Sequence, residues 1–129
     1  MNDTDRPGAF WWWLGLAGCG LLLVLALAPG TPGPSFTYGD KVGHLAAFAL
    51  LGGWFGALRR DALPWIGLAL LAYGGLIELL QGLTPSRLPE WGDLLADLAG
   101  IVLGILLLST GMQRVMVGLE RGLSERRRR

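Results

Sequence analysis

The sequence is poor in charge and in cysteine. Only 16% of its 129 residues are charged, whereas 52% are hydrophobic. This balance excludes a disordered chain and does not fit an ordinary soluble domain. Cys19 is the single cysteine, so an internal disulfide is excluded. The formal net charge is +1, and because most arginines stand at the C-terminus, the charge does not indicate nucleic-acid binding.

Long apolar runs make up most of the remaining sequence, at residues 9–28, 40–58, 64–83 and 91–110. Each is close to the roughly 20 residues that cross a ~30 Å hydrocarbon core, and backbone groups in lipid must bond within the segment. We therefore predict an all-α, polytopic membrane bundle of about four transmembrane helices, in a single domain of residues 1–129. The pairs Gly52/Gly56 and Gly100/Gly104 would let these helices approach closely.

The first run could instead be a cleaved signal peptide, because Ala26-Leu27-Ala28 offers a small-residue cleavage pattern. The acidic residues Asp3 and Asp5 beside a single Arg6, and the length of the run, argue against cleavage. We therefore expect this run to be the first transmembrane helix.

Lysine and arginine predict the orientation of the bundle. Nine of them fall on one side of the four spans, and only Lys41 and Arg87 fall on the other. By the positive-inside rule, both termini are expected on the cytoplasmic side of a bacterial inner membrane. The basic tail, residues 111–129, could form a short amphipathic helix on the inner leaflet, or it could be a frayed end that only enforces topology.

Polar residues gather at the outer ends of three predicted helices. His44 lies about 6 Å further in than Asp40 by helical rise, and Glu78 and Gln81 lie within roughly 8 Å of the outer end of the third helix. The fourth helix is predicted to enter the membrane from the outside, and it carries first Asp93 and then Asp97.

Each of these pairs has a spacing of three or four residues and so occupies one helix face. We predict an outward-facing polar chamber, because ionisable groups at membrane depth usually face a cavity and mark function. Structural roles are the alternative: a helix cap for Asp40, an interfacial charge for Lys41, an ordinary first-turn carboxylate for Asp93, and a loop ion pair for Arg87.

The predicted site comprises His44 and Glu78 as candidate catalytic residues, and six ligand-binding residues: Asp40, Lys41, Gln81, Arg87, Asp93 and Asp97. No cofactor is identified. The carboxylates and the imidazole could ligate a divalent cation, but no spacing matches a metal-binding motif, so none is indicated.

These residues together resemble the VanZ-like family. The pattern is Asp40-Lys41-x-x-His44, then Phe48 and Gly52, Glu78-x-x-Gln81, Arg87, Asp93 and Gly100. Asp97 departs from the family, which often has asparagine there. The resemblance implies a compact membrane bundle and a link to the cell envelope, because the founding member is associated with low-level resistance to the glycopeptide teicoplanin.

Several functions fit these residues. The chamber could bind a lipid headgroup or amphiphilic envelope molecule, with Lys41 and Arg87 on its anionic group. It could belong to a membrane enzyme acting on a lipid-linked substrate, with His44 and Glu78 as acid and base. No serine or cysteine stands beside His44 as a nucleophile, which disfavours covalent acyl transfer. Whether the chain is an enzyme is left open.

Two further functional hypotheses remain. A transporter is disfavoured because no ionisable residue lies in the cytoplasmic half of any span. A structural or assembly subunit without a ligand is a further alternative. Membrane lipids are the expected partners, and the sequence does not indicate the oligomeric state.

Overall fold

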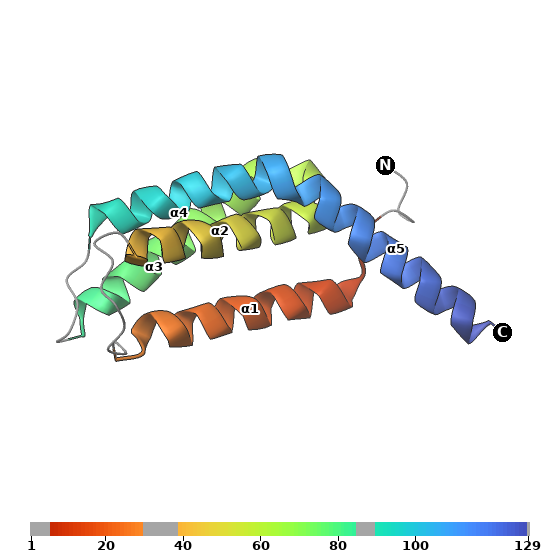
Figure 1. Cartoon of the computed structure of the whole chain (residues 1–129), viewed down its shortest axis with the longest axis horizontal. Coiled ribbons are helices and arrows are strands. Elements are labelled where there is room, and N and C mark those ends of the chain that lie inside the picture. Colours follow the sequence, from red (N-terminus) through yellow and green to blue (C-terminus); the bar gives the residue numbers. More distant parts are fainter. Residues whose placement is uncertain (1–5, 30–38, 85–89, 129) are drawn as a thin grey trace.

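The computed structural model is a bundle of long helices in which the first and last described residues lie at the same end (Figure 1). It describes residues 6–29, 39–84 and 90–128. The elements run in the order α1 (Ala9–Leu27), α2 (Gly39–Leu58), η2 (Arg60–Ala62), α3 (Leu63–Gly82), α4 (Trp91–Leu103), η3 (Gly104–Leu108) and α5 (Ser109–Arg127). Four helical stretches are long and apolar enough to cross a membrane, which confirms the predicted all-helical, four-span architecture.

The first three helices begin and end within one residue of the predicted runs. The fourth run differs, because the helix does not end at Thr110. Instead, α4, η3 and α5 form one continuous helical stretch from Trp91 to Arg127. It contains a π-helical segment, η3, and bends away from the bundle beyond it (Figure 1). A π-turn inserted into an α-helix is a common cause of such a bend.

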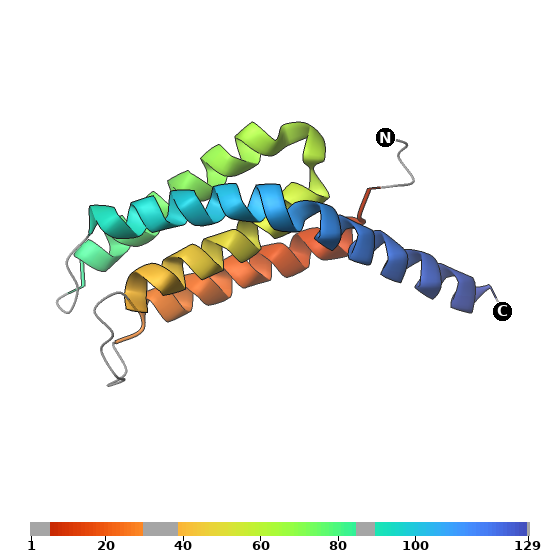
Figure 2. The same ribbon diagram turned by 45° about the horizontal axis from the view of Figure 1, so that its top comes forward.

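The second helix is the centre of the bundle: it contacts α1, α3 and α4 and packs most extensively on α4. In Figure 2 it lies between α1 and α4, with α3 beyond α4. Its close approach to α4 depends on glycine. A Cβ added at Gly52 would lie 2.7 Å from the carbonyl oxygen of Ile101, and one at Gly104 would lie 2.7 Å from the amide nitrogen of Gly53. Gly100 likewise faces the α2 backbone at Leu45. The predicted packing role of these glycines is therefore confirmed.

The first helix is held to the bundle by side chains that reach its backbone. Trp54 Nε1 donates to the carbonyl of Trp11 at 3.0 Å, and the Tyr73 hydroxyl donates to the carbonyl of Cys19. Most other side chains of α1 face outward, and Trp13 is 72% exposed. An apolar helix with so little of its surface buried is suited to a lipid environment.

In the C-terminal helix, α5, the apolar side chains of the predicted amphipathic tail are only partly buried. Met116 is buried, and Met112 packs against the core. Val115, Leu119 and Leu123 remain exposed. At the same end of the molecule, Glu120 Oε1 accepts hydrogen bonds from the Gly8 amide at 2.8 Å and from Trp11 Nε1 at 3.0 Å. The start of α5 therefore packs on the bundle, and Glu120 joins it to the N-terminus of α1.

Candidate functional site

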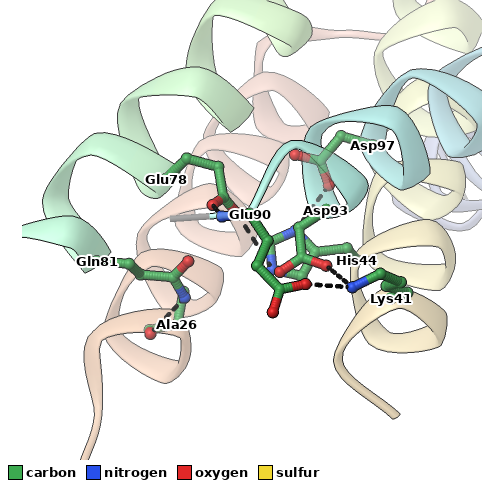
Figure 3. A network of polar contacts seen from close by, with 8 residues as sticks. All are labelled: Ala26, Lys41, His44, Glu78, Gln81, Glu90, Asp93 and Asp97. Carbon is green, nitrogen blue, oxygen red and sulfur yellow. Dashed lines mark hydrogen bonds and ion pairs between the residues drawn. The ribbon is translucent and has the colours of Figure 1, made fainter. Parts of the chain in front are cut away.

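A histidine–aspartate pair lies at the end of the bundle opposite the termini. His44 Nδ1 on α2 is 2.8 Å from Asp97 Oδ1 on α4, and Asp97 is fully buried (Figure 3). With Asp97 as a carboxylate, which can only accept, Nδ1–H is the donor, and in the neutral ring Nε2 then carries the lone pair. The Phe48 ring lies parallel to the imidazole, at 6.4 Å between centroids. These contacts fix the orientation of the ring.

Glu78 of α3 faces the other side of the imidazole. Its Oε1 lies 3.9 Å from His44 Nε2, and its Oε2 accepts the backbone N–H of Glu90 at 3.1 Å. Glu90 is the N-cap residue of α4, where a carboxylate is favoured by the helix dipole. Glu78 is only 8% exposed, and its Oε1 has no hydrogen-bond partner among the described residues.

Lys41 bridges two carboxylates on the opposite side of the site. Its Nζ lies 2.5 Å from Glu90 Oε2 and 3.3 Å from Asp93 Oδ1 (Figure 3). The ammonium lowers the pKa of the Glu90 carboxyl below its usual range. The Lys41–Glu90 pair therefore stays ionised at neutral pH, and its contribution to stability is lost only as the pH falls through that lowered pKa.

We refer to Lys41, His44, Glu78, Asp93 and Asp97 as the polar cluster. It contains three buried carboxylates, one ammonium and one imidazole, contributed by α2, α3 and α4. Asp97 Oδ2, like Glu78 Oε1, has no hydrogen-bond partner within the described part of the chain. Because an unsatisfied buried acceptor costs free energy, the cluster is suited to a ligand that brings donors or positive charge.

The remaining residues of the predicted site lie in different places. Gln81 Nε2 donates to the carbonyl of Ala26 at 2.9 Å, so this amide joins α3 to α1. Asp40 is exposed and lines a small pocket of about 200 Å³ with His44 and Gln81. Arg87 lies outside the described residues. The binding and catalytic roles of all eight residues remain predictions.

An apolar groove of about 540 Å³ between α3 and α4 leads to the polar cluster. Its walls include Leu79, Leu83 and Trp91, which are 64%, 76% and 83% exposed. Glu78 and Glu90 supply its carboxylates. In a membrane, such exposed apolar side chains would face acyl chains, so this groove would connect the hydrocarbon region with a buried carboxylate.

Sequence reasoning missed two residues of this site. Glu90 is not among the predicted site residues, whereas its side chain accepts from Lys41 and its amide donates to Glu78. Gly74 of α3 lies against Asp97, because a Cβ there would come within 3.2 Å of the carboxylate carbon. Its spacing of four residues from Glu78 places both on one helix face, and that pattern could have identified it.

The fold and the site together define a polytopic membrane protein with a buried polar cluster at one end of its bundle. The family model described as VanZ/LLP1 matches residues 8–113, so the chain belongs to the VanZ/LLP1 family. The resemblance inferred from the sequence is thereby confirmed. No curated protein and no solved structure matches the chain.

Proposed function

We propose that this protein binds a membrane amphiphile, with its polar headgroup at the polar cluster and its hydrocarbon part in the groove between α3 and α4. The observation that carries this proposal is the continuity between an apolar, outward-facing groove and the buried carboxylate of Glu78. An amphiphile could reach the cluster from within its own leaflet, without passing through water.

The charges of the site favour a headgroup with hydroxyl or amine donors. Three buried carboxylates offer acceptor oxygens, two of them unpartnered among the described residues. Lys41, predicted to bind an anionic group, is already shared between Glu90 and Asp93. An anionic part of the ligand would therefore have to compete for Lys41 or be bound by Arg87, the other cation predicted on this side.

The proposed setting is the bacterial inner membrane, with both termini cytoplasmic and the polar cluster facing outward. Tolerance of teicoplanin is the phenotype that the family resemblance suggests. It would follow if the bound amphiphile were an envelope component whose state affects glycopeptide action, and it is tested by comparing teicoplanin susceptibility with and without the gene.

The proposal is tested by native mass spectrometry of the full chain, released from membranes in detergent and incubated with the total polar lipid extract of its host. We expect a lipid adduct on the wild type. Gly75→Leu should abolish it, because Gly75 lines the groove, a Cβ there meets no atom within 4 Å, and a larger side chain would occupy the groove. Glu78→Gln should weaken it.

The matched control is Gly18→Leu, which makes the same substitution on α1 at a position where a Cβ also meets nothing within 4 Å. This variant should keep the adduct. A wild type without adduct, or an adduct that persists unchanged in Gly75→Leu, would contradict the proposal and favour a structural subunit without a ligand.

A membrane enzyme is the second candidate, favoured by the hydrogen bond between His44 and Asp97. A carboxylate on Nδ1 orients the imidazole and stabilises its protonated form, which is the arrangement of a general base. In the same lipid extract, products analysed by liquid chromatography and mass spectrometry should depend on His44 and Glu78. Turnover that survives the loss of both side chains would exclude this assignment.

A further inference from the structure

We propose that His44, Glu78 and Asp93 form a binding site for a divalent cation of the zinc or manganese type. Each of these residues offers one ligand atom, and the three atoms lie within 4.8 Å of one another. They come from α2, α3 and α4, so the site is assembled by the packing of three helices. This inference concerns a metal alone and does not depend on the proposed amphiphile.

The unpartnered oxygen of Glu78 is the second observation. Oε1 is buried and aimed at His44 Nε2, at 3.9 Å. That separation is too long for a hydrogen bond, which requires about 2.7–3.2 Å. Two ligand atoms bound tetrahedrally to one zinc ion at about 2.1 Å each lie roughly 3.4 Å apart. The gap between the two atoms therefore suits a shared cation better than a shared proton.

The surroundings of these ligands match those of metal centres. A histidine that binds a metal through one nitrogen usually donates from the other to a carboxylate, as His44 Nδ1 does to Asp97 at 2.8 Å. The second oxygen of Glu78 is fixed in the same way by the Glu90 amide at 3.1 Å. Two of the three proposed ligands are thus already oriented by partners of their own.

Charge and donor type narrow the choice of ion. One imidazole nitrogen and two carboxylate oxygens suit zinc or manganese, whereas calcium and magnesium prefer oxygen ligands alone. A divalent cation would also offset the carboxylates of Glu78, Asp93 and Asp97, against which Lys41 supplies a single charge. Three protein ligands would leave a coordination position for water or a headgroup oxygen.

The test is zinc binding by the full chain in detergent, purified without a polyhistidine tag and stripped with a chelator. Isothermal titration with zinc chloride and elemental analysis after desalting should give one zinc per chain. His44→Ala, Glu78→Gln and Asp93→Asn should each abolish this binding. Asp97→Asn should weaken it by about 10–100-fold, since Asp97 acts through His44.

Glu125→Gln is the control, because it removes an exposed carboxylate of α5, away from the polar cluster, and should leave the affinity unchanged. Cobalt gives an independent readout. Wild type and Glu125→Gln should show the strong visible absorption of low-coordinate cobalt, and Glu78→Gln should not. A wild type that binds neither zinc nor manganese, or equal binding by wild type and Glu78→Gln, would overturn the proposal. The readout is bound metal and no lipid is added, so failure here is distinct from failure of the lipid experiment.

Discussion

Asp97 shows how much one side chain in this bundle depends on its neighbours. It is fully buried, yet only one of its oxygens has a hydrogen-bond partner among the described residues. The other, Oδ2, lies against Gly74, where a side chain would occupy the same space. The carboxylate can therefore stand beside His44 only because the facing position on α3 has no Cβ.

Gly74→Ala is expected to displace the Asp97 carboxylate and to destabilise the protein by about 1–3 kcal/mol, the usual cost of overpacking. Unfolding in a detergent titration measures the loss, and the ¹⁵N chemical shifts of the His44 ring report the changed hydrogen bond. Gly75→Ala is the adjacent control, because a Cβ there meets no atom within 4 Å. Equal stability and unchanged shifts in Gly74→Ala would contradict this account.

At the scale of elements, the contact between α2 and the stretch formed by α4 and η3 organises the bundle. Glycines on both sides bring the two backbones close together, and this closeness places His44 within reach of Asp97. In lipid, such contacts gain stability from van der Waals packing, because burying apolar surface gives little advantage over acyl chains.

Gly104→Ala is expected to destabilise the bundle by about 1–3 kcal/mol, because the new methyl would meet the backbone of α2 rather than a side chain that can move. Gly111→Ala, further along the same helical stretch, meets nothing within 4 Å and should be neutral or stabilising by up to about 1 kcal/mol through helix propensity. If a detergent unfolding titration finds Gly104→Ala less stable than the wild type and Gly111→Ala at least as stable, the contact is supported. A neutral Gly104→Ala would refute it.

The link between α5 and α1 should depend on Glu120, whose carboxylate accepts from the amide at the start of α1 and from Trp11. Glu120→Ala removes a capping interaction of about 0.5–2 kcal/mol. Amide hydrogen exchange at Gly8 and in the first turn of α1 should become faster. Glu125→Ala, at the exposed end of the same helix, should leave these rates unchanged, and equal rates in both variants would exclude the link.

The whole molecule has two chemically different ends. The end with both termini carries most of the arginines, including Arg59, Arg60 and Arg114, whereas the opposite end carries the buried carboxylates. This asymmetry underlies the proposed orientation, because positive residues are retained on the cytoplasmic side.

The orientation can be measured with single cysteines in a Cys19→Ser background. A membrane-impermeant maleimide applied to intact spheroplasts should label Thr84→Cys, which follows α3 at the end with the polar cluster. It should label Ser124→Cys, on α5, only after the membrane is opened. The reverse pattern would place the polar cluster in the cytoplasm and would overturn the outward-facing site.

The sequence by itself determined the class of fold and the bounds of most helices. Apolar runs of about 20 residues leave helices as the only spanning structure in lipid, so α1, α2 and α3 could be located within one residue. Helical rise alone predicted that His44 and Glu78 lie near the same end of the bundle, and the structure brings the two side chains together there. Only the end of the fourth helix was placed wrongly, because nothing in the polar tail stops a helix.

Only the tertiary structure decided which of the polar residues meet. Helical spacing shows which side chains share a face, but the rotation of each helix about its axis is set by packing against its neighbours. That rotation brings His44, Glu78 and Asp97 together and turns Gln81 to the backbone of α1. Helical spacing could show that Gly74 shares a face with Glu78, but the contacts of Glu90 and of Gly74 arise only where α4 packs against α2 and α3.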